Sequence, residues 1–114
     1  MSTDPNCIFC KIIDKQIPAN LIKEEKDYVV LRDINPQAPT HVLIVPRAHV
    51  ANVTLFEDAA GLGKLFQAAK DVAAMENLKQ GFRLVVNTGD DGGQTVDHLH
   101  IHVLGGRALG WPPG

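Results

Sequence analysis

Three histidines alternate with apolar residues near the end of the chain. His98, His100 and His102 occupy every second position of residues 98–103, which read His-Leu-His-Ile-His-Val. Successive side chains of a β-strand point to opposite faces, so this spacing predicts one face of imidazoles and one apolar face. Neutral imidazole is a competent nucleophile near neutral pH, and a covalent intermediate divides a difficult displacement into two easier ones. The central member, His100, is the natural attacker.

A glycine-rich loop directly precedes the histidine row. Residues 88–96 contain three glycines. Backbone amides in such a loop can form a concave nest that stabilises negative charge on phosphate oxygens. The candidate amides belong to Gly92, Gly93, Gln94 and Thr95. The alternative for this segment is a plain flexible hairpin loop.

The junction of this loop with the histidine row favours a phosphate ligand, with His100 as the nucleophile that attacks phosphorus. His102 would then donate to a phosphate oxygen, while the backbone near His98 fixes the tautomer of the nucleophile. Two alternatives stay open. Alternating histidines can also bind zinc or another transition metal, although Asp97 is the one carboxylate close to them in sequence. A solvated strand face can also carry histidines without any function.

The elements that must position these side chains follow from apolar spacing and turn residues. Apolar residues at helical spacing, after capping side chains at Asp4 and Asn6, predict a short helix that ends before Pro18. A longer helical pattern runs from Asp58 to Leu78. The predicted strands are residues 21–25, 28–32, 40–45, 82–87 and 99–104, the first two forming a hairpin. We therefore expect an α+β fold around an antiparallel sheet of about five strands.

Length and composition limit the class of protein. The 114 residues are 45% hydrophobic, enough for one core, so residues 1–114 are expected to form a single domain. A formal charge of −2 and scattered basic residues do not favour nucleic-acid binding. We find no apolar run of membrane-spanning length and no features of a secretory signal at the N-terminus. The expectation is a cytoplasmic protein with neither a membrane nor a nucleic-acid partner.

Several motifs together resemble the histidine triad (HIT) superfamily. Residues 98–103 match its alternating His-apolar signature, and further segments resemble its Hint branch, the histidine triad nucleotide-binding proteins. These segments are residues 33–41, Asn87, 91–94, 104–107 and 111–114. The resemblance implies a HIT-like fold and a homodimer with sheets paired across the subunits. It also implies binding of purine nucleoside monophosphates and hydrolysis of their phosphoramidates through a nucleotidyl intermediate on His100.

The same resemblance assigns roles to other residues. His102 and Asn87 would contact the α-phosphate, Gly93 and Thr95 would lie on the phosphate and leaving-group side, and His41 would support the imidazole network. Thr95 stands where many Hint proteins have serine, which affects access for the leaving group. The implied nucleoside pocket consists of Ile8, Phe9, Ile12, Asp33 and Ile34. Asp33 is suited to accept hydrogen bonds from ribose hydroxyls.

A cysteine pair near the N-terminus resembles one that binds zinc in other superfamily members. The implied ligands of a structural zinc are Cys7, Cys10, His49 and His98. The catalytic chemistry itself would need no cofactor. Two alternatives remain for the pair: buried thiols beside a surface His49, or a thioredoxin-like redox pair, which would normally follow a strand.

Two rival functions also fit the motifs. One is hydrolysis of dinucleoside polyphosphates, an activity of another branch of the superfamily. Residues 105–107 and 111–114 favour the Hint branch over it. The other rival is a nucleotide-binding regulatory protein with little turnover, since binding and catalysis need the same pocket.

Overall fold

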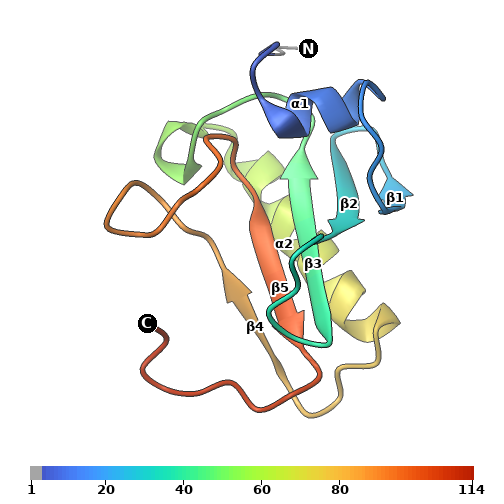
Figure 1. The fold of residues 1–114 in the computed structure, drawn as a ribbon, viewed down its shortest axis with the longest axis vertical. Coiled ribbons are helices and arrows are strands. Elements are labelled where there is room, and N and C mark those ends of the chain that lie inside the picture. The colour runs from blue at the N-terminus through green and yellow to red at the C-terminus, as the bar shows by residue number, and fades with distance from the viewer. Residues whose placement is uncertain (1–3) are drawn as a thin grey trace.

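A five-stranded antiparallel sheet lies between two helices (Figure 1). The computed structural model describes residues 4–114. The elements are α1 (Ile8–Ile13), β1 (Leu21–Glu24), β2 (Tyr28–Arg32), β3 (Thr40–Pro46), a 3-10 turn (Val53–Leu55), α2 (Ala59–Met75), β4 (Phe82–Val85) and β5 (Ile101–Gly105). The strand order is β1-β2-β3-β5-β4, with every neighbouring pair antiparallel. The predicted α+β fold, with one long and one short helix, is confirmed.

Each face of the sheet packs against one helix because the strand residues alternate. On one face, Val42 of β3 pairs with Val103 of β5 and both are fully buried against α2. On the other face, Leu43 and Val45 belong to a second core cluster with the apolar residues of α1. The next residues along β5 therefore point alternately towards α2 and α1, which places His102 on the α1 side of the sheet.

Several predicted element boundaries differ from the structure, since β1 ends at Glu24, β3 at Pro46, β4 at Val85 and α2 at Met75. β5 begins at Ile101, not residue 99, because the backbone N–H groups of His98 and Leu99 donate to Val96 and Val50 and not to a strand. The helix α1 is capped by Cys7, whose Sγ accepts from Cys10 N at 3.4 Å. The expected capping residue Asp4 instead accepts from Asn6 N, so it stabilises the preceding turn.

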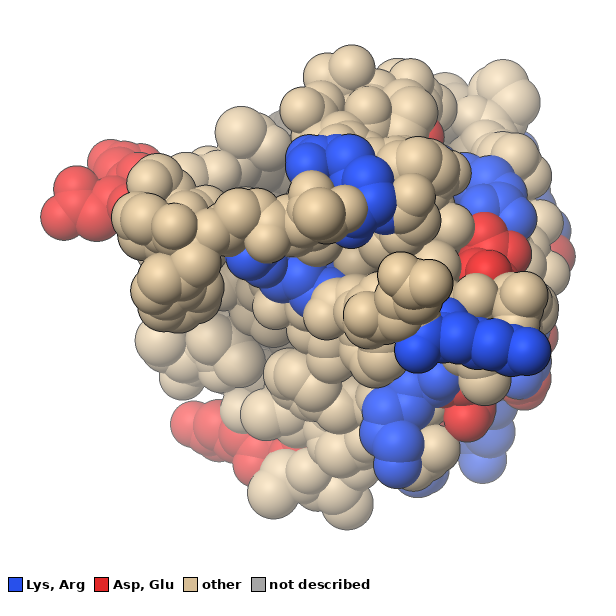
Figure 2. Space-filling model, turned by 90° about the horizontal axis from the view of Figure 1, so that it is seen from below, with Lys and Arg blue, Asp and Glu red and all other residues tan. Residues whose placement is uncertain are grey.

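The surface shows scattered charge. Seen from the end where β5 finishes, Lys and Arg form separate patches, some of them beside acidic side chains (Figure 2). An ion pair between Arg32 and Glu76, with Nη1 and Oε1 2.6 Å apart, joins the end of β2 to the residue after α2. Within residues 4–114, neither helix has the length and apolarity needed to cross a bilayer.

Candidate functional site

Two cysteines from the start of the chain meet two histidines from distant segments. The four ligand atoms of Cys7, Cys10, His49 and His98 all lie within 4.8 Å of one another. His98 Nδ1 lies 3.3 Å from Cys7 Sγ, 3.7 Å from Cys10 Sγ and 3.1 Å from His49 Nδ1. His98 Nε2 lies 2.8 Å from the carbonyl oxygen of Pro46, which can only accept, so Nε2 carries the ring proton. The lone pair on Nδ1 therefore faces the other three ligand atoms.

This Cys/His tetrad fits the geometry of a tetrahedral zinc site. Zinc bonds of about 2.3 Å to sulfur and about 2.0–2.1 Å to nitrogen place tetrahedral ligand atoms roughly 3.3–3.8 Å apart. The distances from His98 Nδ1, between 3.1 and 3.7 Å, match this range closely. His49 Nε2, on the outer side of its ring, lies 3.9 Å from a carboxylate oxygen of Asp4, which can orient the ring.

The nucleophile candidate His100 is held in one tautomer by the backbone. Its Nδ1 lies 2.7 Å from the carbonyl oxygen of His98, so Nδ1 carries the proton and Nε2 keeps a free lone pair. The side chain is only 6% exposed. The ring of Phe9 meets it edge-on, with centroids 5.1 Å apart. His98 thus contributes its imidazole to the tetrad and its carbonyl to His100.

A chain of hydrogen bonds sets the protons of the remaining two imidazoles. The backbone N–H of Gln37, which was not predicted as a site residue, donates to His41 Nδ1 at 3.0 Å. Neutral His41 therefore carries its proton on Nε2, which lies 2.8 Å from His102 Nδ1 and 3.4 Å from a carboxylate oxygen of Asp33. Donation to His102 Nδ1 leaves the His102 proton on Nε2. Among residues 4–114, His102 Nε2 is the one buried side-chain nitrogen or oxygen without a hydrogen-bond partner.

Burial disfavours the charged form of all four imidazoles at this site. Burial lowers the pKa of His98 and of His102 to about 4, and nearby imidazoles add to the effect. Burial also lowers the pKa of His100, although its bond to the His98 carbonyl opposes the shift. The pKa of His41 is lowered by burial too, against the opposing charge of Asp33. A neutral ring is the form in which imidazole is both a nucleophile and a metal ligand.

The residues expected to line a nucleoside pocket divide into buried and exposed ones. Phe9 and Ile12 are each 7% exposed and belong to the core between α1 and the sheet. Ile8 and Ile34 are 45% and 90% exposed. The structure brings Phe9 and Asp33 directly against the imidazoles, whereas Ile12 is packed as a core residue.

The loop before the histidines closes on itself. The amides of Gly93 and Gln94 donate to the carbonyls of Asp90 and Gly89, and the Gln94 side chain accepts from Gly89 N at 3.0 Å. Two of the four amides predicted to cradle a phosphate, those of Gly93 and Gln94, therefore already have backbone acceptors, whereas a four-amide nest would leave them free for the phosphate; the nest stays a prediction. The preference of short glycine-rich loops for internal turn bonds explains the difference.

Thr95 and Asn87 lie farther from the imidazoles than the other site candidates. Thr95 lines a cavity of about 360 Å³ together with Ile8 and His49, so it lies next to the tetrad. Asn87 is half-buried just beyond β4. Among residues 4–114, neither side chain hydrogen-bonds to a histidine, so their predicted phosphate contacts stay predictions.

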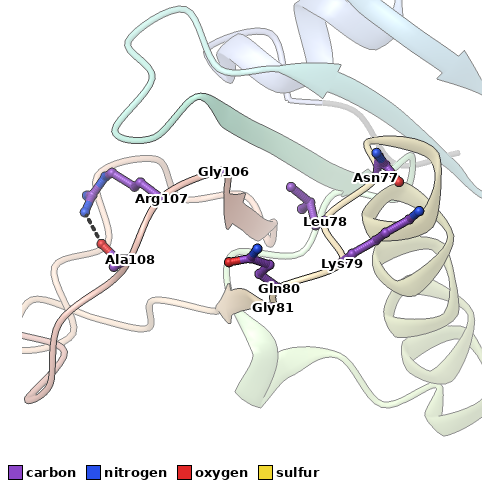
Figure 3. Close-up of a pocket in the computed structure, with 8 residues that line it drawn as sticks. All are labelled: Asn77, Leu78, Lys79, Gln80, Gly81, Gly106, Arg107 and Ala108. Atoms are coloured by element: carbon purple, nitrogen blue, oxygen red, sulfur yellow. Dashed lines mark hydrogen bonds between the residues drawn. The ribbon is translucent and has the colours of Figure 1, made fainter.

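A larger cavity lies away from the histidines, beyond the end of β5. It has a volume of about 530 Å³ and lies between the turn after α2 and residues 106–108 (Figure 3). Its two charged residues do not converge on a ligand. The guanidinium of Arg107 turns back onto the carbonyl of Ala108, and Lys79 points towards the end of α2 (Figure 3).

Comparison with known proteins identifies the family. The family model described as the HIT domain matches residues 14–109. The chain belongs to the HIT domain family. A HIT-like protein of Synechococcus elongatus, named as uncharacterized, is 50% identical over 94% of this chain and 96% of its own.

Solved structures of HIT proteins share the fold closely. A HIT family hydrolase from Legionella pneumophila is 46% identical and superposes with a TM-score of 0.92, covering 96% of this chain and all of its own. A histidine triad nucleotide-binding protein from Candida albicans is 32% identical, with a TM-score of 0.82, 94% of this chain covered and 83% of its own. This HIT chain is therefore similar to family hydrolases, and the HIT-like fold is confirmed.

The neutral histidines of this HIT domain make its stability depend on pH. Their pKa values are lowered in the folded state, so below pH 6.5 the unfolded chain binds more protons than the folded one. We expect the free energy of unfolding to be highest above pH 6.5 and to fall as the pH drops from 6.5 towards 4. Urea unfolding across this range, with a chelator present so that metal binding adds no pH dependence of its own, measures the slope.

The variant His102→Gln isolates one of these groups. Glutamine stays uncharged, so the slope between pH 6 and 5 should decrease by about 1.4 kcal/mol per pH unit, the equivalent of one proton. The exposed control Lys26→Gln should leave the slope unchanged. An unaltered slope in His102→Gln would show that His102 binds a proton as readily in the folded protein as in the unfolded chain, which would contradict the lowered pKa of this ring.

Proposed function

We propose that this HIT protein hydrolyses purine nucleoside phosphoramidates through a nucleotidyl intermediate on His100. The proposal rests on two ring nitrogens at the site that have complementary roles, one offering a lone pair and the other an N–H group. His100 Nε2 offers a lone pair because Nδ1 donates to the His98 carbonyl, and His102 Nε2–H is a buried donor with no partner in the described protein. The rings lie 4.8 Å apart, centroid to centroid. A lone pair beside a buried donor suits attack on phosphorus with stabilisation of a phosphate oxygen.

The reaction proceeds in two displacements. In the first, a bond forms between His100 Nε2 and the α-phosphorus while the bond from phosphorus to the amine breaks, and the amine leaves with a proton. In the second, water attacks phosphorus, the nitrogen–phosphorus bond breaks and neutral His100 is restored. The net reaction consumes one water and releases an amine and a nucleoside monophosphate. His102 Nε2–H donates to the phosphate in both steps, and His41 holds His102 in that tautomer.

The remaining site residues bind the nucleotide in this proposal. Phe9 and Asp33, which contact the imidazoles, would lie on the base and ribose side, with Asp33 accepting from ribose hydroxyls. The other proposed nucleoside contacts are Ile8, Ile12 and Ile34, and the other proposed phosphate contacts are Asn87, Gly93 and Thr95. The name of the relative from Candida albicans, a nucleotide-binding protein, supports a nucleotide as the ligand class.

Adenosine phosphoramidate tests the mechanism directly. We expect the wild-type protein to release the amine and to show a nucleotidyl adduct on His100 by rapid-quench mass spectrometry. His100→Ala should lose the adduct and at least 100-fold of the turnover, roughly the contribution of a covalent nucleophile. Lys26→Gln serves as the matched surface control.

Each result has a distinct reading. Equal hydrolysis by His100→Ala would rule out covalent catalysis by His100. Nucleotide binding without turnover in the wild type would favour the regulatory alternative. Faster release from a dinucleoside polyphosphate than from the phosphoramidate would favour the other branch of the superfamily.

We also propose that the Cys/His tetrad binds a structural zinc and that the whole chain, 1–114, acts as one domain around it. Cys7 and Cys10 precede residues 14–109, the segment that the family model matches, yet they face His98 beside the proposed nucleophile. Four protein ligands leave no position for substrate, so the ion would hold α1 to the sheet and take no part in the chemistry. Ligation needs reduced thiols, which supports a cytoplasmic location.

Metal content tests the tetrad. We expect about one zinc per chain in the wild type by elemental mass spectrometry, and none in the double variant Cys7→Ser/Cys10→Ser. His41→Gln, which alters the second cluster of Asp33, His41 and His102, should retain the ion. Chelation should lower the Tm of the wild type and leave that of the double variant unchanged. Zinc retained in the double variant would refute the assignment.

A homodimer is the third part of the proposal. β4 is an edge strand that pairs only with β5, so its outer N–H and C=O groups are open. Phe82 of this strand is exposed, and so is Phe66 of α2, which leaves apolar surface uncovered. A second copy of the chain can cover this surface and extend the sheet by pairing two β4 strands across a two-fold axis.

Sedimentation equilibrium tests the dimer. We expect a mass of twice the 12.4 kDa chain for the wild type and a shift towards 12.4 kDa for Phe82→Glu, because a charge in a buried contact opposes association. The exposed Lys26→Glu, between β1 and β2 at the opposite edge of the sheet from β4, is the control and should stay dimeric. A wild-type mass of 12.4 kDa at tens of micromolar would contradict this part of the proposal.

A further inference from the structure

The turn after β5 contacts the loop that holds His41. Arg107 donates from Nε and Nη2 to the carbonyl oxygen of Gln37, at 3.2 and 2.9 Å, and from Nη1 to the carbonyl of Ala108 at 2.9 Å. Within residues 4–114, these are the only hydrogen bonds that the Gln37 carbonyl accepts. Among the described residues, no carboxylate oxygen lies within 4.0 Å of Arg107, so it forms no ion pair with them. All three guanidinium nitrogens of Arg107 therefore donate to backbone carbonyls.

The backbone of this turn is shaped for close approach to the same loop. Gly106 adopts φ +90°, a conformation that side chains disfavour, and a Cβ there would lie 2.9 Å from Pro39 Cβ. Gly105 pairs with Thr40 at the start of β3, which fixes the register of the two segments. A glycine is therefore needed to bring Arg107 within reach of Gln37.

The Gln37 peptide links Arg107 to the imidazoles. Its carbonyl accepts from Arg107, and its N–H donates to His41 Nδ1 at 3.0 Å. If that N–H turned away, neutral His41 could carry its proton on Nδ1 and accept from His102 with Nε2. The His102 proton would then move to Nδ1, and His102 Nε2 would lose the hydrogen that faces the site. The two imidazoles therefore share two alternative proton arrangements, of which only one presents a donor at His102 Nε2.

We propose that Arg107 is a positioning residue that selects the donor arrangement of His41 and His102 by holding the Gln37 peptide. This inference rests on the proposed function only for its kinetic consequence. Arg107 does not touch the reacting atoms in this scheme. It acts through the Gln37 peptide and the rings of His41 and His102. Gly106 contributes by letting the turn approach the loop closely enough for this contact.

Two readouts test the inference, one of which needs no substrate. The ¹⁵N chemical shifts of the histidine rings report which nitrogen carries each proton. In the wild type we expect Nε2–H on both His41 and His102, and in Arg107→Ala a mixture of both arrangements. With adenosine phosphoramidate, kcat should fall about tenfold while KM changes less than twofold, because only the donor-competent fraction turns over. Added guanidinium should restore much of the lost kcat, and Arg107→Lys should show a smaller loss.

Arg83 provides a matched control. It also donates to a backbone carbonyl, that of Gly110, at 2.5 Å, but it does not contact the His41 loop. Arg83→Ala should leave both the ring shifts and kcat unchanged. Gly106→Ala should reproduce the effect of Arg107→Ala, since it displaces the turn without removing the guanidinium.

The outcomes separate this inference from the proposed function. Unchanged ring shifts in Arg107→Ala, or an equal change in Arg83→Ala, would overturn the role of Arg107. If the wild type does not hydrolyse phosphoramidates, the proposed function fails, while the ring shifts of the free proteins still decide whether Arg107 selects the proton arrangement.

Discussion

Buried imidazoles must have both ring nitrogens assigned to a donor or an acceptor, and much of this structure serves that requirement. His98, His100 and His41 are each almost fully buried. Backbone groups determine which ring nitrogen carries the proton. The Pro46 carbonyl does so for His98, the His98 carbonyl for His100, and the Gln37 amide for His41. A backbone group cannot change its hydrogen-bonding role as a side chain can, so each ring is held in a single protonation pattern. Among these imidazoles, two ring nitrogens are left without a partner in the described residues, the Nε2 atoms of His100 and His102, and the one on His102 is buried.

The fold supplies these partners because the sheet lies between two different environments. The α2 side takes the aliphatic residues Val42, Ile44, Ile101 and Val103 of β3 and β5. The α1 side combines a smaller apolar cluster with the imidazoles, and Phe9 belongs to both. Burial on this side lowers the pKa of the histidines, so the packing that stabilises the sheet also keeps the rings neutral.

The features that could be predicted from the sequence are those that depend on the pattern of side chains along a strand or helix. The alternation of residues 98–103 predicted the segregation of imidazoles from aliphatic residues, and the helical spacing of residues 58–78 predicted α2. The ligand set of the tetrad came from family resemblance, because Cys7 and His98 are too far apart in sequence for spacing to relate them. The role of Gln37 could not be predicted, since it acts through its backbone amide and any residue except proline has one. The occupied amides of Gly93 and Gln94 were missed for the same reason: loop hydrogen bonds depend on how the loop closes.

The link between Cys7 and His98 also has a consequence for how the protein is made. These residues are 91 positions apart, and contacts of such separation form late because the intervening chain must first be ordered. During synthesis, the two thiols emerge long before either histidine that faces them. The sheet can begin to pair while the thiols are still exposed, so we expect the N-terminal helix to dock onto the histidines after the sheet has formed, and His100 to gain its shielded environment with that step.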